Sequence, residues 1–178
     1  TTEDISNQSS NTIIKNLRRI NIFKSISNQD IKSSFFEKKL NKSITDDLSK
    51  IELDEFSSDI VLSNATIEHV GGEQNQRKMI DNIIKLSKKV FVISTPNRYY
   101  PIDFHTKIPF LHWLPKTYHR QILKIIGLSF YAQEENLNLL SKKDLILFMK
   151  KYDFKNKILN IKLFNINSNL ILIGIKKF

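Results

Sequence analysis

Two short apolar runs near the middle of the chain, at 59–62 and 90–94, are each bounded by polar residues. Continuous apolar runs of this length are typical of parallel strands that are covered on both faces. Polar residues follow the runs directly, at 63–69 and at 95–98. Because ligands collect at the carboxyl ends of such strands, the pattern predicts two neighbouring strands with a binding site at their ends.

The segment 73–89 between these runs predicts a helix that covers one face of the sheet. Its apolar residues recur at the spacing of one face of an amphipathic helix, and they are Met79, Ile80, Ile83, Ile84 and Leu86. Further helices are expected at 11–19, 31–40, 116–126 and 141–151. Gly127 suits the left-handed position after a helix, and Ser141 with Asp144 resembles a capping box.

The end of the chain predicts a hairpin, because two strand-like runs, at 157–164 and 169–176, are joined by a short polar turn. Shorter strands are expected at 21–26 and 42–45. Strands that alternate with helices and finish in a hairpin predict an α/β fold. We expect a Rossmann-like, mostly parallel sheet that is flanked by helices and has a C-terminal antiparallel hairpin.

The length of 178 residues predicts a single domain, 1–178, with an irregular insert at about 99–116 that holds three of the four prolines. The longest apolar runs fall short of the roughly 20 residues that span a bilayer, so we expect no membrane span. The chain has no cysteine, which excludes a disulfide framework and thiolate chemistry. A cytoplasmic location fits this composition.

The net charge of +10 permits attraction to nucleic acid. Its lysines are scattered in pairs, however, and no arginine-rich run or aromatic RNA-binding signature accompanies them. A basic nucleic-acid-binding module is therefore the weakest of the functions considered, and a charged, solvated surface explains the lysines equally well.

Several motifs occur along the chain in a fixed order. They are Ser63-Asn-Ala-Thr-Ile-Glu-His-Val70, Gln76-Arg77, Ser94-Thr-Pro-Asn-Arg98, Phe104-His-Thr106 and His112-Trp-Leu-Pro115. In this order and spacing they resemble the class I S-adenosylmethionine-dependent methyltransferases, in particular a bacterial branch with the Thr-Pro-Asn-Arg and His-Trp-Leu-Pro motifs. The resemblance implies methyl transfer from S-adenosylmethionine to a small-molecule or saccharide acceptor.

Methyltransferases of this class begin with a strand and a glycine-rich loop, whereas none of the four glycines of this chain lies near its start. We therefore expect a fragment that is truncated at the N-terminus and lacks the first strand, with 2–4 and 10–11 as the tail of the first loop. The alternative to an active enzyme is a catalytically incomplete remnant of the fold.

The resemblance also implies which residues contact the cofactor. Asp30 is expected near the ribose, Asp46 and Asp47 near the adenine, and Asp4 near the lost first loop; for these acids, ordinary turn chemistry is the alternative. The residues after the strand at 59–62 are expected to line the pocket for the methionine part of the donor, and they are Ser63, Asn64 and Ala65.

Glu68 and His69 have three interpretations. They orient the substrate or act as a base, since an imidazole accepts a proton near neutral pH; they bind a divalent metal, as in quinone O-methyltransferases with a similar Glu-His-Val; or they fix the start of a helix. We take Glu68, His69 and His105 as the candidate catalytic residues and assign no residue to a metal.

The insert is expected to form the acceptor side of the site and to act as a lid. Its candidate substrate-binding residues are Asn97, Arg98, Tyr99, His112 and Trp113. Arg98 either clamps an anionic acceptor or pairs with a neighbouring acid. The alternative is a packed surface flap in which Trp113 belongs to the core and the histidines bond to backbone carbonyls.

Overall fold

A computed structural model of the chain describes residues 24–27 and 38–176. The contacts divide the chain into two compact units, residues 1–56 and 57–178. The helix expected at 11–19 lies outside the described residues, as do residues 21–23 of the first expected strand. None of the helices in the described part of the chain is long and apolar enough to cross a bilayer.

The first unit contains a parallel pair of short strands, β1 (Lys24–Ser27) and β2 (Lys38–Asn41), followed by the helix α2 (Lys50–Phe56). The strand at 24–26 is confirmed. The helix expected up to residue 40 is wrong at 38–40, which belong to β2, and the strand expected at 42–45 is a turn. The helical spacing of the sequence extends to residue 40, but 38–41 instead pair with β1 in a strand of only four residues.

The helix α2 was not predicted from the pattern. Ser49 begins it with reciprocal hydrogen bonds: the Glu52 amide donates to the Ser49 hydroxyl at 3.2 Å, and the Ser49 amide donates to the Glu52 carboxylate at 2.7 Å. An ion pair of 3.0 Å between Lys42 and Glu52 then connects the turn after β2 to the first turn of α2. These bonds, rather than an apolar stripe, define the start of the helix.

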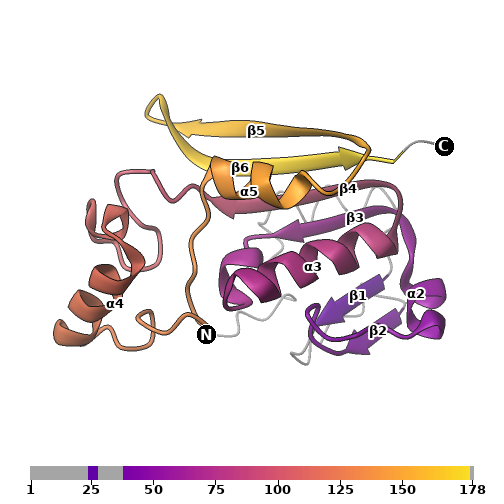
Figure 1. Cartoon of the computed structure of the whole chain (residues 1–178), viewed down its shortest axis with the longest axis horizontal. Coiled ribbons are helices and arrows are strands. Elements are labelled where there is room, and N and C mark those ends of the chain that lie inside the picture. Colours follow the sequence, from indigo (N-terminus) through magenta and orange to yellow (C-terminus); the bar gives the residue numbers. More distant parts are fainter. Residues whose placement is uncertain (1–23, 28–37, 177–178) are drawn as a thin grey trace. The chain divides into compact units, whose positions relative to one another are not determined.

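The second unit is built on a four-stranded sheet of β3 (Ser58–Asn64), β4 (Ser87–Pro96), β5 (Lys155–Leu163) and β6 (Ile166–Ile175). Figure 1 shows their order, β3-β4-β6-β5. The strands β3 and β4 are parallel, and the hairpin of β5 and β6 joins the sheet antiparallel to β4. The α/β fold with a Rossmann-like sheet and a C-terminal antiparallel hairpin is confirmed.

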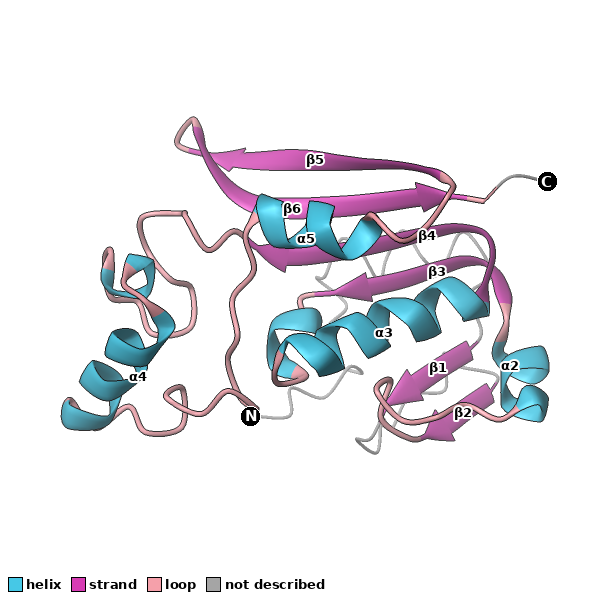
Figure 2. Ribbon diagram, in the orientation of Figure 1, coloured by secondary structure: helices cyan, strands magenta, loops and turns pink. Residues whose placement is uncertain are grey.

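Two helices, α3 (Glu73–Leu86) and α5 (Lys142–Met149), lie on the same face of this sheet (Figure 2). The expected apolar stripe of α3 is buried, as are Phe91 and Leu172 of the sheet. The two helices contact each other, since the Arg77 guanidinium lies 4.3 Å from the centre of the Phe148 ring. The capping box of Ser141 and Asp144 at the start of α5 is confirmed.

The remaining helix, α4 (Lys116–Ile125), follows the insert and stands apart from the sheet (Figure 1). It ends just before Gly127, whose φ of 84° confirms the expected left-handed position. The hairpin turn differs from the expected one: Phe164 and Asn165 have positive φ and make a two-residue turn directly between β5 and β6. The residues expected in the turn therefore belong largely to β6.

Gly174 of β6 lies directly against the ring of Phe91 on β4. A Cβ atom at this position would stand 2.1 Å from the nearest ring carbon. We predict that Gly174→Ala lowers the free energy of unfolding by about 1–3 kcal/mol, because the buried ring has no room to move. Urea unfolding measures the change. The control is Ile175→Ala at the partly exposed next position; an equal or smaller loss for Gly174→Ala would contradict the packing.

Candidate functional site

The polar residues that follow β3 and β4 lie at the same edge of the sheet, because the two strands are parallel neighbours in register. The side chain of Ser94 donates a hydrogen bond to that of Asn64, and the Ala65 amide donates to the Ser94 carbonyl at 3.0 Å. Ala65 has a φ of 48°, so the chain turns sharply there. The buried Ser63 hydroxyl has no hydrogen-bond partner among the described residues.

A short 3-10 helix, η3 (Ile67–His69), follows this turn and carries Glu68 inward. The Glu68 side chain is completely buried. One carboxylate oxygen, Oε2, accepts a hydrogen bond of 2.9 Å from the Thr95 hydroxyl of β4. The other oxygen, Oε1, has no hydrogen-bond partner in the described part of the chain. Burial raises the pKa of Glu68, against the opposing hydrogen bonds and the nearby imidazoles.

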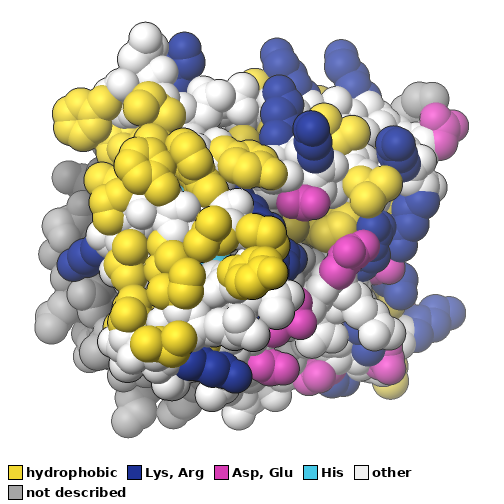
Figure 3. Space-filling model, turned by 60° about the vertical axis from the view of Figure 1, so that its left-hand side comes forward, with side chains coloured by type: hydrophobic (Ala, Val, Ile, Leu, Met, Phe, Trp, Pro, Cys, Tyr) yellow, Lys and Arg dark blue, Asp and Glu magenta, His cyan; other side chains and the backbone are white. Residues whose placement is uncertain are grey.

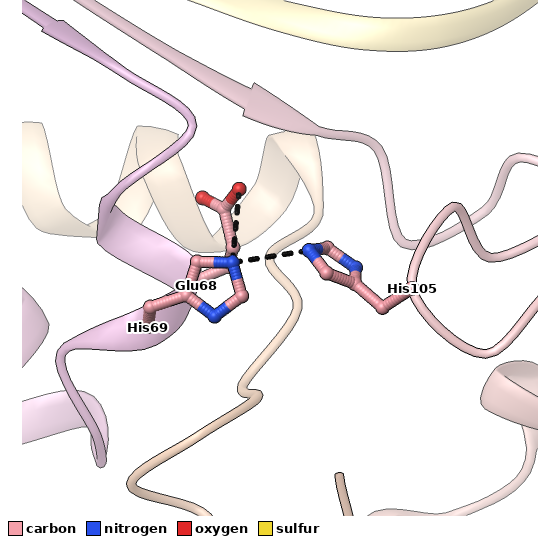
Figure 4. Close-up of side chains that lie close together, drawn as sticks. All are labelled: Glu68, His69 and His105. Atoms are coloured by element: carbon pink, nitrogen blue, oxygen red, sulfur yellow. Dashed lines mark hydrogen bonds and ion pairs between the residues drawn. The ribbon is translucent and has the colours of Figure 1, made fainter. Parts of the chain in front are cut away.

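The rings of His69 and His105 meet beside this carboxylate (Figure 4). Their Nε2 atoms are 3.0 Å apart, and the Nε2 of His69 lies 4.0 Å from Oε1 of Glu68. Each ring is also held on its other side. The Nδ1 of His69 is 2.6 Å from the Asn136 carbonyl, and the Nδ1 of His105 is 3.0 Å from the Asp103 carboxylate. The structure therefore brings together all three candidate catalytic residues.

Asp103 fixes the loop that carries His105. Its buried carboxylate accepts hydrogen bonds from the His105 amide at 3.1 Å and from the Thr106 hydroxyl at 2.7 Å. Burial alone would raise the pKa of Asp103, but the hydrogen bonds from His105 and Thr106 outweigh it and hold the pKa well below its ordinary value. The carboxylate is thus ionised and orients the ring of His105.

A second set of hydrogen bonds braces the other side of the site. The buried side-chain amide of Gln76 on α3 donates to the backbone carbonyl of Ile67 at 3.1 Å and to that of Asn138 at 2.7 Å. The backbone N–H of Asn138 donates to the Glu68 backbone carbonyl at 2.7 Å, and the Asn138 side chain donates to the Gly71 carbonyl at 3.0 Å. The segment before α5 is thereby fastened to η3.

Two candidate substrate-binding residues donate hydrogen bonds to backbone carbonyls. Asn97 donates from its amide group to the Asn167 carbonyl at 2.8 Å. Arg98 donates to the carbonyls of His112 and Leu114, at 3.3 and 3.0 Å. Arg98 therefore closes the insert on itself, and no carboxylate pairs with it among the described residues.

The rest of the insert has features of both alternatives, an acceptor-side lid and a packed surface flap. The buried His112 bonds through Nε2 to the Tyr100 carbonyl at 2.7 Å, as expected of a packed flap. Trp113, by contrast, is 44% exposed and does not belong to the core. Figure 3 shows hydrophobic side chains over much of the face that carries the insert and α4. Large exposed side chains there include Tyr99, Phe110, Tyr118 and Phe130.

A small hollow, open to solvent and with an enclosed volume of about 20 Å³, lies between the insert and α4, and basic residues dominate it. Its basic lining consists of Arg98, His112, Lys116, His119 and Arg120. Glu134 pairs with Arg120 at 3.0 Å, and Lys116 donates to the Asn138 side chain at 2.6 Å. Burial lowers the pKa of His119, whose Nε2 has no hydrogen-bond partner within the described ranges. Arg98 and Lys116 thus line the hollow without an ion pair to a carboxylate in the described part of the chain.

The acids expected at the cofactor all precede the second unit in the sequence. Asp4 and Asp30 fall outside the described residues. Asp46 and Asp47 follow β2 in the first unit, where the Asp46 carboxylate accepts a hydrogen bond of 2.9 Å from the Ser43 amide. That bond is ordinary turn chemistry, and contact with a cofactor stays a prediction for all four acids.

Four residues of the site were missed in the sequence: Gln76, Thr95, Asp103 and Asn138. Thr95 and Asp103 lie within or beside the matched motifs, but nothing in their spacing indicates that they meet Glu68 and His105. A signal was present for Asp103, since Asp, His and Thr at 103, 105 and 106 form a local turn pattern.

No protein-family model and no curated protein matches this sequence. Among solved structures, the chain is similar to a SAM-dependent methyltransferase from Methanosarcina mazei, with a TM-score of 0.52, 12% identity and coverage of 94% of this chain and 88% of that one. The second unit and its hairpin thus belong to a known architecture. The chain has a Rossmann-like α/β fold.

The chain is also similar to a protein described as a putative Zn-dependent alcohol dehydrogenase from Rhodobacter sphaeroides, with a TM-score of 0.59, 12% identity and coverage of 93% and 79%. An O-methyltransferase family protein from Burkholderia thailandensis is 13% identical over 78% of this chain, with a TM-score of 0.47. This chain spans 35% of the Burkholderia protein. Identities this low establish the fold alone, so the activity must be argued from the site.

We predict that Asp103→Asn destabilises the protein by about 1–3 kcal/mol at neutral pH, because a charged partner of His105 and Thr106 is lost. The Asp103 pKa is lowered in the folded state, so its contribution is full above the unfolded value of 3.8 and is lost progressively as the pH falls from that value toward the lower folded pKa. The gap between the unfolding free energies of the two proteins, measured from about pH 6 to about pH 3, should therefore be constant at first and begin to narrow below about pH 4, near the unfolded aspartate pKa.

The control for this prediction is Asp59→Asn, which removes an exposed ion pair with Lys89. It should change the unfolding free energy by less than about 1 kcal/mol. An Asp103→Asn protein whose deficit stays constant down to pH 3, below about the unfolded aspartate pKa, would contradict the ionised state of Asp103.

Proposed function

We propose that the chain is an S-adenosylmethionine-dependent methyltransferase domain that acts on a small-molecule or saccharide acceptor with an anionic group. The observation that carries the proposal is the convergence of Glu68, His69 and His105 at the carboxyl ends of β3 and β4. The fold supplies the class of reaction, and this cluster supplies groups that act on an acceptor.

The donor supplies an electrophilic methyl group, which an acceptor takes by in-line displacement. The protein's task is to hold donor and acceptor in line. We assign the donor's methionine part to Ser63, Asn64 and Ala65, where the chain turns sharply and a buried hydroxyl has no partner within the described residues. The donor contacts expected of Asp4, Asp30, Asp46 and Asp47 stay predictions from the sequence.

The acceptor approaches from the insert. A hydroxyl acceptor must lose its proton, and His69 and His105 present imidazole nitrogens at the edge of the sheet. Asp103 and the Asn136 carbonyl orient the two rings. Tyr99 and Trp113, both exposed, supply an apolar wall beside Asn97 and Arg98.

The basic hollow is the observation that favours an anionic acceptor. Arg120, Lys116 and the two buried imidazoles of His112 and His119 surround it. Burial, and next the charge of Arg98, lower the pKa of Lys116. A carboxylate or phosphate there would relieve the mutual repulsion of these groups and meet donors that are already positioned. A catalytically incomplete remnant is the alternative, and donor binding distinguishes the two.

We predict that isothermal titration calorimetry detects S-adenosylhomocysteine binding at one site per chain with a Kd in the micromolar range. Asn64→Ala should weaken binding by about tenfold, the equivalent of roughly one hydrogen bond. Asn160→Ala, at an exposed position of β5, is the matched control and should bind as the unmodified chain does. Absence of binding at millimolar ligand would favour the remnant.

We predict that benzoate, but not benzamide, shifts the NMR signals of the His112 and His119 rings. Arg120→Gln should weaken benzoate binding by about tenfold or more, because a charge-assisted hydrogen bond is lost. Lys124→Gln removes the same charge from an exposed position of α4 and should leave binding unchanged. Equal shifts with benzamide, or equal losses in both variants, would show that the hollow does not select an anion.

A further inference from the structure

In the cluster of Glu68, His69 and His105, three atoms that carry lone pairs face one another. One ligand atom from each residue lies within 4.8 Å of the others. Figure 4 shows the two imidazole rings directed at each other beside the carboxylate. The hydrogen bonds on the far sides of the rings determine which ring nitrogens carry hydrogen, and they are the basis of the argument.

Both Nδ1 atoms face groups that only accept hydrogen bonds. The Nδ1 of His69 is 2.6 Å from the Asn136 carbonyl oxygen. The Nδ1 of His105 is 3.0 Å from the Asp103 carboxylate, which accepts from Thr106 as well. Both Nδ1 atoms must therefore carry the hydrogen. A neutral imidazole has one N–H only, so both Nε2 atoms present lone pairs.

These two Nε2 lone pairs face each other across 3.0 Å. The Oε1 of Glu68, 4.0 Å from the Nε2 of His69, adds a third electron-rich atom. Oε1 belongs to a completely buried side chain and has no hydrogen-bond partner among the described residues. Three donor atoms that converge without a hydrogen between them need a positive charge in their midst.

We propose that Glu68 Oε1, His69 Nε2 and His105 Nε2 bind a divalent transition-metal ion such as Zn²⁺. Two imidazoles and one carboxylate are a usual donor set for such ions. With Zn–N distances of about 2.0–2.1 Å, tetrahedral geometry separates two ligand atoms by roughly 3.3 Å. The observed separation of the two nitrogens, 3.0 Å, needs only a small adjustment.

The surroundings also match those of a metal site. Histidine ligands commonly donate their other N–H to a carbonyl or a carboxylate, which orients the ring; here the Asn136 carbonyl and Asp103 do so. Thr95 holds the second oxygen of Glu68. A shared proton would satisfy the two nitrogens but would leave Oε1 without a partner, whereas a metal ion engages all three atoms.

Three protein ligands leave the fourth position of a tetrahedral ion open. If the proposed methyl transfer is correct, that position faces the acceptor, and an acceptor oxygen bound there would lose its proton more easily. This consequence rests on the proposed function. Metal binding itself does not, because the donor set is complete without methyl donor or acceptor.

Zn²⁺ titration of the untagged, chelator-treated chain tests the proposal by calorimetry. The chain has no cysteine and four histidines, so few other groups compete for the metal. We expect one Zn²⁺ per chain and, with Co²⁺ instead, visible absorption bands of a four-coordinate site. Glu68→Gln and His105→Ala should weaken Zn²⁺ binding at least about 10- to 100-fold, the loss that even an outer-shell change causes.

His119→Ala is the matched control, because it removes a buried histidine from the basic hollow instead. NMR of the unmodified chain provides a second readout that does not depend on the folding of any variant. Zn²⁺ should shift the ring signals of His69 and His105 and leave those of His112 and His119 in place. Zn²⁺ affinity that is unchanged in Glu68→Gln and His105→Ala, or shifts confined to His112 and His119, would overturn the proposal.

Discussion

The buried carboxylate of Glu68 is the constraint on which the site depends. Removing a carboxylate from water costs several kcal/mol unless partners replace the solvent. Thr95 at the end of β4 donates to one carboxylate oxygen, and the ring of His69 in η3 lies 4.0 Å from the other. His105 of the insert reaches this group through His69, 3.0 Å away, so the pair of imidazoles connects the insert to the edge of the sheet.

The sheet and its helices provide the rigidity for this arrangement. The parallel register of β3 and β4 places both polar strand ends at one edge. Gln76 of α3 and Asn138 before α5 then fasten η3 through buried hydrogen bonds. Glu68 consequently lies on well-packed elements, whereas His105 comes from a loop that Asp103 must organise. Positions on such loops are suited to selecting an acceptor.

The sequence predicted the elements whose periodicity is strong. The stripe of α3 and the apolar runs of β4 and β6 were identified because each buries a regular face, and β3 and β5 were identified from their apolar runs although Ile60 and Leu62 of β3 are exposed. The strand β2 was not, since Lys38, Lys39 and Asn41 are exposed and carry no burial signal. Its short pairing with β1 is a tertiary property that a local pattern does not contain.

For the site, the sequence identified Glu68, His69 and His105 individually but not their contact. The meeting of the two rings depends on the path of the insert, which an irregular loop does not reveal in its spacing. The partners of Arg98 differ from the expected anion or acid for the same reason. The carbonyls of His112 and Leu114 lie close to Arg98 only after the insert folds back. Sequence patterns give the least information about residues whose contacts depend on how a loop folds.

The central claim is that the ends of β3 and β4 form a donor site that faces this cluster. A crystal structure of the chain with S-adenosylhomocysteine tests it most directly. The account predicts that the homocysteine part lies beside Ser63, Asn64 and Ala65, with its sulfur directed toward His69 and His105. A ligand bound at the opposite edge of the sheet, or with its sulfur turned away from these rings, would contradict it.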